Sequence, residues 1–144
     1  MEVLGFQRHG GDAEYLIVPE RVCLPMPEKM SYVAGAISTD AIGNLYSTMK
    51  EMRVCGNDLV AVVGLGPMGL SGIIAAIGMG ATVVAIDVVE ERLRKAKELG
   101  AHYTVNPKEV DPMEFISEIS PEGVDKAVDC SGVNGGINLS LIHI

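Results

Sequence analysis

A glycine-rich turn between two aliphatic runs limits what this chain can fold into more than any other feature. Residues 59–63 are all aliphatic, as a strand must be when helices cover both faces of its sheet. Residues 70–81 have helical length, and residues 81–86 form a second aliphatic run that ends at Asp87. The glycines between the first run and the helix have the spacing G-x-G-x-x-G: Gly64, Gly66 and Gly69. This order of elements predicts a dinucleotide-binding unit.

Each part of the turn has a separate physical task. Gly64 permits the tight turn, Gly66 lets the backbone approach a pyrophosphate, and Gly69 lets the helix lie close to the sheet. The free N–H groups of the first helical turn attract phosphate, and a proline is tolerated there. The alternative is a tight turn in an α/β protein that binds no nucleotide. The turn residues predicted to bind the cofactor are Gly64, Gly66, Pro67, Met68 and Gly69.

Asp87 indicates which nucleotide would bind. A carboxylate at the end of the second strand accepts hydrogen bonds from the adenosine ribose hydroxyls and repels a 2′-phosphate, so NAD is favoured over NADP. Arg92 lies five residues further on and could approach the same ribose. Taken alone, Arg92 is better explained as one of the charges on the solvated face of a helix that follows the second strand.

The alternation of strands and helices continues beyond Asp87. A short third strand is expected at residues 102–105, an amphipathic helix at 111–120 and a fourth strand ending near Cys130. The helix has an apolar set made of Met113, Phe115, Ile116 and Ile119. Right-handed crossovers then give a parallel sheet of order 3-2-1-4, so the fold class is α/β, a partial Rossmann fold.

The first part of the chain follows another pattern. Residues 13–19 and 21–27 are short extended segments in which prolines exclude helix. Residues 31–52 are helical in pattern, with a break at residues 38–40. We place the boundary between a β-rich piece, residues 1–40, and the nucleotide-binding domain, residues 41–144, at this break.

Composition narrows the possible partners. A formal charge of −8 and an isoelectric point near 4.8 argue against nucleic acid or an anionic membrane surface as a partner. The chain has neither a signal peptide pattern nor an apolar run long enough to span a bilayer. Its three cysteines are widely spaced, which fits a reducing cytoplasm better than a disulfide framework.

Several segments, taken in order, resemble the medium-chain zinc-dependent alcohol dehydrogenases, most closely the polyol and threonine dehydrogenase-like members. They are "GFQRHGGDAEYLIVPE", "LPMPEKMSYVAGAISTDAIGNLYSTM", "GNDLVAVVGLGPMGLSGIIAAIGMGA", "AIDVVEERLRKAKELGA" and "AVDCSG". The resemblance implies a zinc- and NAD-dependent oxidoreductase that moves hydride between an alcohol or polyol and nicotinamide, in a homo-oligomeric parent protein. It also implies that residues 1–40 are the remnant of a GroES-like catalytic domain, and that Asp87 and Arg92 bind the adenosine ribose.

By this resemblance, much of the family's zinc chemistry would precede Gly5, and Asp40 (or, with a one-residue slip, Thr39) stands where many members place a zinc-ligating cysteine. A carboxylate can bind zinc, so Asp40 is a candidate metal ligand. The alternative is that Asp40 caps the following helix. The three histidines, His9, His102 and His143, show no ligand spacing.

We expect the chain to be an inactive fragment of its parent, with residues 139–144 foreign to the natural protein. Two other functions are compatible with a glycine turn followed by an acid. One is a zinc-free quinone or enoyl reductase of the same superfamily. The other is an S-adenosylmethionine-dependent methyltransferase, which would not explain residues 5–40.

Overall fold

A computed structural model describes residues 3–142 of the chain. Its contacts divide the chain into two compact units, one ending at Ser31 and the other beginning at Tyr32.

The unit that ends at Ser31 has little regular structure in its described residues. Its regular structure consists of a short 3₁₀ helix, η1 (Glu20–Val22), and an isolated bridge between Leu4 and Arg8. The predicted extended segments, 13–19 and 21–27, form no strand among residues 3–31, because extended backbone becomes a strand only when another segment pairs with it. Phe6 and Ile17 are more than four-fifths exposed, and no side chain among residues 3–31 is buried, so this described part forms no hydrophobic core.

The second unit begins with two helices, α1 (Tyr32–Thr39) and α2 (Ala41–Glu51). They meet at Asp40, which confirms the break predicted at residues 38–40. Because α1 packs on α2, the compact units divide after Ser31, ahead of the domain boundary predicted at residue 40. The origin of residues 1–40 in a catalytic domain remains a prediction.

A four-stranded parallel sheet forms the centre of this unit. Its strands are β1 (Leu59–Val63), β2 (Thr82–Ile86), β3 (Tyr103–Val105) and β4 (Lys126–Asp129). The spatial order is β3-β2-β1-β4, which confirms the predicted order 3-2-1-4. In the register of the central strand, Val62 lies opposite Ala85 on one side and Val128 on the other.

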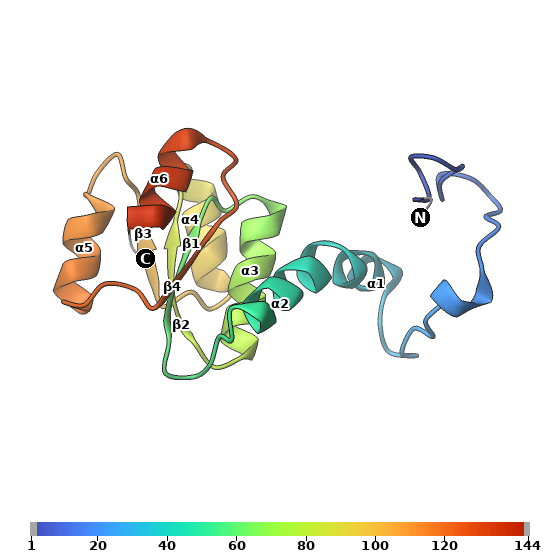
Figure 1. The fold of residues 1–144 in the computed structure, drawn as a ribbon, viewed down its shortest axis with the longest axis horizontal. Helices are drawn as coiled ribbons and strands as arrows, with labels where there is room; N and C mark the ends of the chain where they lie inside the picture. Colours follow the sequence, from blue (N-terminus) through green and yellow to red (C-terminus); the bar gives the residue numbers. More distant parts are fainter. Residues whose placement is uncertain (1–2, 143–144) are drawn as a thin grey trace. The chain divides into compact units, whose positions relative to one another are not determined.

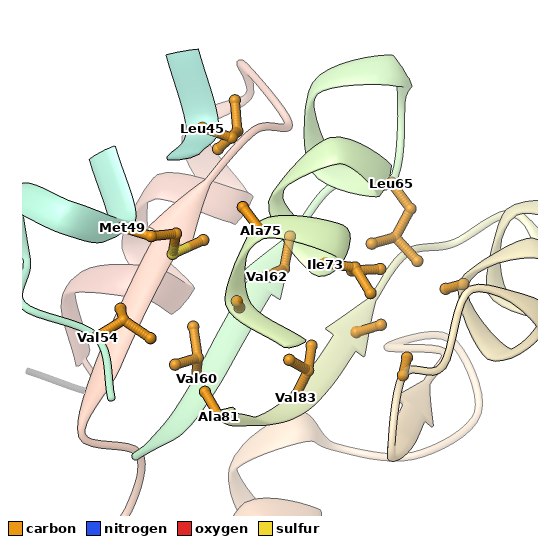
Figure 2. Close-up of a cluster of buried hydrophobic side chains, with 14 of the residues drawn as sticks. Leu45, Met49, Val54, Val60, Val62, Leu65, Ile73, Ala75, Ala81 and Val83 are labelled. Atoms are coloured by element: carbon orange, nitrogen blue, oxygen red, sulfur yellow. The ribbon is translucent and has the colours of Figure 1, made fainter. Parts of the chain in front are cut away.

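Helices cover both faces of the sheet, as the doubly wound α/β fold requires. They are α3 (Pro67–Gly78), α4 (Glu90–Glu98), α5 (Pro112–Ile119) and α6 (Asn134–Ile142). Figure 1 shows α3 and α5 on opposite sides of the strands. Alternate strand residues therefore enter two cores. The larger core joins β1 and β2 to α2, α3 and α4 (Figure 2), and its largest buried members include Met49, Leu65, Ile73, Val60, Val62 and Val83. The smaller lies on the α5 side and contains Val63, Val84, Ile86, Val105 and Ile116.

The packing of two helices adds to the sequence prediction, and at one residue corrects it. Met113 of α5, predicted in the apolar set, is exposed, whereas Pro112, the first residue of the helix, is buried and lines a cleft at the carboxyl ends of the strands. Gly72 of α3 faces α2, since a Cβ there would lie 3.3 Å from a side-chain atom of Leu45. The absence of a side chain at Gly72 thus lets α2 approach α3.

Candidate cofactor-binding site

A cleft of about 640 Å³ lies at the carboxyl ends of β1, β2 and β4. The strand order reverses between β1 and β4, and ligands of open α/β sheets bind in the crevice at such a point. The cleft is lined by the glycine turn, the end of β2 and the segment after β4. Its lining includes Gly64, Gly66, Asp87, Arg92, Cys130 and Ser131.

The three glycines of the turn have different surroundings. Gly64 has a φ of +85°, and a Cβ there would lie 2.5 Å from the backbone of Ser131. A Cβ on Gly69 would lie 1.9 Å from the carbonyl oxygen of Gly64, so no side chain fits between the helix and the turn. A Cβ on Gly66 would meet nothing within 4 Å. Gly64 and Gly69 are therefore needed for packing, whereas Gly66 borders open space in the cleft.

Helix α3 begins directly after Gly66. Pro67 is its first residue, Met68 is partly exposed, and the Gly66 carbonyl accepts a hydrogen bond from the Leu70 N–H. The first N–H groups of an α-helix have no partners within the helix, and the helix dipole is positive at this end. The cleft thus borders a helix terminus that attracts anions.

Asp87 lies at the end of β2 with only 6% of its surface exposed. One carboxylate oxygen accepts a hydrogen bond from the Leu65 N–H at 2.6 Å, and the other accepts from the Val89 N–H at 2.9 Å. The Leu65 bond ties the glycine turn to β2, a role that sequence reasoning did not identify. The signal available in the sequence was that β1 and β2, as neighbours, must end side by side.

Arg92 is placed beside Asp87. Its Nη1 atom lies 3.4 Å from a carboxylate oxygen of Asp87, while half of its side chain is exposed. Further along α4, Arg94 and Lys95 pair with Glu98 at the exposed surface of the helix. Arg92 therefore differs from these neighbours in facing the cleft.

The segment after β4 was not predicted as part of the site. Asp129 ends the strand and accepts hydrogen bonds from the Ser131 N–H at 3.1 Å and the Ser131 hydroxyl at 2.6 Å. Burial, together with the nearby Asp129 charge, raises the pKa of the Cys130 thiol. At neutral pH this thiol stays protonated, so it is not an activated nucleophile. The pattern of an acid followed two residues later by serine was visible in the sequence.

Asp40 lies outside this cluster of residues. It occupies the N-cap position of α2, but its carboxylate accepts a hydrogen bond from the Asn44 side chain at 2.8 Å and caps no backbone N–H. Among residues 3–142, no group of three His, Cys, Asp or Glu side chains could hold a metal ion. His102 accepts the Val83 N–H at Nδ1, and His143 lies outside the described residues. The structure therefore leaves Asp40 without companion ligands in the part of the chain it describes.

In the same part of the chain, none of the helices combines the length and apolarity needed to cross a bilayer. The three cysteines, Cys23, Cys55 and Cys130, are free thiols.

Comparison with known proteins identifies the family. A zinc-type alcohol dehydrogenase-like protein of Escherichia coli K12, YphC, is 39% identical over 140 residues, which are 95% of this chain and 39% of that protein. (R,R)-butanediol dehydrogenase of Bacillus subtilis is 36% identical over 125 residues, covering 86% of this chain and 36% of that enzyme. The chain thus spans about two-fifths of the length of these relatives.

A solved structure agrees with these sequences. A protein of Sinorhizobium meliloti 1021 assigned as a zinc-binding dehydrogenase, bound to NADP, superposes with a TM-score of 0.90 at 30% identity, covering 97% of this chain and 42% of that one. Residues 67–143 match the family described as zinc-binding dehydrogenase. These findings confirm the resemblance to medium-chain zinc-dependent alcohol dehydrogenases. Because the match spans more than half of its residues, the chain belongs to the zinc-binding dehydrogenase family.

Proposed function

We propose that this chain supplies the NAD-binding part of an alcohol or polyol dehydrogenase. The observation that carries the proposal is the pairing of an open glycine position, Gly66, with a buried acid, Asp87, in one cleft. When bound, NAD would supply the nicotinamide ring that accepts hydride from the alcohol.

The residues of the cleft divide the binding task. The pyrophosphate would lie over Gly66 at the first turn of α3, where Pro67, Met68 and Gly69 begin the helix. The adenosine ribose would lie at Asp87, whose oxygens retain lone pairs beyond those used by two backbone N–H groups. The half-exposed side chain of Arg92 lies beside Asp87 and would border the same ribose.

The preference for NAD over NADP is supported by charge. Asp87 is negative and buried, and a 2′-phosphate would approach it with only the half-exposed Arg92 to offset the repulsion. The Sinorhizobium protein is bound to NADP, so family membership does not fix this choice. The proposal rests on Asp87 of this chain.

The proposal that zinc takes part in the reaction rests on family membership and not on the described residues. Residues 3–142 do not fit a zinc site, so no step of the reaction is derived from a metal here. We propose zinc dependence for the whole protein, with Asp40 as a candidate ligand, and we expect this chain alone to bind NAD without oxidising alcohols. We also propose that the whole protein is a homo-oligomer in the cytoplasm, a compartment in which cysteines such as the free thiols of this chain stay reduced.

Family membership favours the dehydrogenase over the alternatives. The methyltransferase interpretation has no support from the matched family, and the relatives above are named as alcohol and butanediol dehydrogenases. A zinc-free reductase would use the same cofactor cleft, so zinc content of the whole protein separates it from the proposed enzyme.

Calorimetric titration of this chain with NAD and NADP tests the proposal. We expect NAD to bind more tightly than NADP. Asp87→Asn should reduce this preference, measured as the dissociation constant of NADP divided by that of NAD, by about 10-fold or more. Asparagine is chosen because its side-chain oxygen can still accept a hydrogen bond from a backbone N–H of the turn. Asp125→Asn, at the opposite end of the sheet, is the control. Equal affinities in the unmodified chain would refute the NAD preference.

A further inference from the structure

The strands β2 and β4 end in the same local structure. Asp87 accepts the N–H of Val89 at 2.9 Å, and Asp129 accepts the N–H of Ser131 at 3.1 Å, each two residues further along the chain. The second of these turns is held more firmly. Asp129 also accepts the Ser131 hydroxyl at 2.6 Å, and the hydroxyl oxygen accepts the Val133 N–H at 3.3 Å.

The turn after β4 lies directly against the glycine turn. A Cβ on Gly64 would come within 2.5 Å of both N and Cα of Ser131, and the Cys130 N–H donates to the Val63 carbonyl at 2.7 Å. On its other side, a Cβ on Gly136 would lie 2.0 Å from the Ser131 hydroxyl oxygen. Ser131 therefore packs between the glycine turn and α6, and its bonds to Asp129 hold it in that position.

Ser131 also forms part of the cleft, on the β4 side. A dinucleotide crosses the point where the strand order reverses, so its two halves lie on the two sides of β1. If the adenosine half lies at Asp87 on the β2 side, the other half must meet the wall that contains Ser131.

We propose that Asp129 is a positioning residue for the cofactor, because it holds Ser131, and with it the β4 wall of the cleft, at a fixed distance from the glycine turn. The inference rests on the proposed NAD binding. A wall that is ordered before binding does not have to be ordered by the ligand, so losing this restraint weakens binding of the half that contacts it.

Two ligands separate the halves of the cleft. AMP reaches only the Asp87 side, whereas NAD spans both sides. For Asp129→Ala we expect the dissociation constant of NAD to rise by about 10-fold and that of AMP to stay within about twofold. Asp129→Asn should bind NAD nearly as the unmodified chain does, because the amide oxygen can accept from both Ser131 groups.

A matched control lies at the residue before β4. Asp125 accepts the Leu59 N–H at 2.7 Å at the amino end of the sheet, away from the cleft. Asp125→Ala removes the same kind of carboxylate bond, and it should leave both dissociation constants within about twofold of the original. If Asp129→Ala proves unfolded, Ser131→Ala, which removes only the hydroxyl, should show the same selective loss of NAD affinity to a smaller degree.

The outcomes distinguish the two proposals. Equal weakening of NAD and AMP by Asp129→Ala, or no weakening of either, would overturn the positioning role while leaving NAD binding intact. Failure of the unmodified chain to bind NAD would overturn the proposed function instead. In that case the hold of Asp129 on Ser131 is tested without ligand, by the amide NMR signal of Gly64. This signal must shift in Asp129→Ala and not in Asp125→Ala. An unchanged Gly64 signal would overturn the positioning role independently of any ligand.

Discussion

The two ends of the parallel sheet use acidic residues in different ways. At the amino end, Asp58 forms an ion pair with Lys126 at 2.6 Å and accepts the Cys55 N–H at 2.7 Å. At the carboxyl end, Asp87 accepts two backbone N–H groups and has a longer, 3.4 Å contact with the half-exposed Arg92, while Asp129 accepts the N–H and the hydroxyl of Ser131. The amino end thus contains a short, partly buried ion pair in addition to Asp125, which accepts the Leu59 N–H. The acids of the carboxyl end bond chiefly to backbone and hydroxyl groups, with one longer contact to the half-exposed Arg92.

This difference predicts that substitutions at the two ends of the sheet have different effects on stability and on binding. Removing one partner of a partly buried ion pair leaves the other charge uncompensated, which destabilises the fold. An acid held by backbone N–H groups keeps its negative charge and fixes the position of the turns around a ligand. Changes at the amino end should thus alter the free energy of unfolding, and changes at the carboxyl end should alter binding as well.

The largest effect is expected from the glycine turn itself. Gly69→Ala would place a Cβ 1.9 Å from the Gly64 carbonyl oxygen, so α3 must move away from the turn. We expect a loss of about 3 kcal/mol or more in the free energy of unfolding, together with loss of NAD binding. Denaturant unfolding and calorimetry measure the two effects.

Gly78, at the other end of the same helix, provides the control. A Cβ there would meet nothing within 4 Å. Gly78→Ala should stabilise the chain by about 0.5–1 kcal/mol, because alanine loses less conformational freedom in a helix. If Gly69→Ala and Gly78→Ala behaved alike, close packing of the turn would not be the reason for glycine at position 69.

The next effect tests the amino end of the sheet. Asp58→Ala would leave the partly buried Lys126 ammonium and the Cys55 N–H without their acceptor. We expect a loss of about 1–3 kcal/mol in stability and no change in the affinity for NAD. Glu98→Ala, which removes an exposed partner of Arg94 and Lys95, should have no resolvable effect. A clear loss of NAD affinity in Asp58→Ala would contradict the separation of the two ends.

The same ion pair predicts a dependence on pH. The hydrogen bond from Lys126 lowers the pKa of Asp58 from its ordinary value of 3.8. A carboxyl group with a lowered pKa in the folded state adds stability above its unfolded pKa and loses this contribution as the pH falls through the folded value. The stability difference between the unmodified chain and Asp58→Asn should therefore be full at neutral pH and should shrink below about pH 4. Urea unfolding at several pH values measures it, and a difference that grew on acidification would be contrary to this assignment.

Local patterns in the sequence predicted the sheet and the glycine turn, whereas contacts between distant segments could not be predicted. The aliphatic runs and the G-x-G-x-x-G spacing depend on neighbours in the chain, so the order β3-β2-β1-β4 followed from them. The bond from the Leu65 N–H to Asp87 and the contact of Ser131 with Gly64 join residues far apart in sequence. Helix α6 was also missed, because its glycines and asparagines give a weak helical pattern.

The smallest effect concerns the charge that Asp129 leaves at the cleft. Burial and this charge raise the pKa of Cys130, whereas Cys23 and Cys55 are exposed. Because the thiolate is the reactive form, Cys130 should be alkylated more slowly than the other two at neutral pH. Asp129→Asn removes the charge but keeps an acceptor for Ser131, so it should move the pH profile of Cys130 alkylation downward and raise its rate at a given pH by no more than about 10-fold. Mass spectrometry of the alkylated peptides measures each cysteine separately, and Cys55 serves as the internal control. An unchanged Cys130 profile in Asp129→Asn would mean that burial alone raises this pKa and that the Asp129 charge does not act on the cleft.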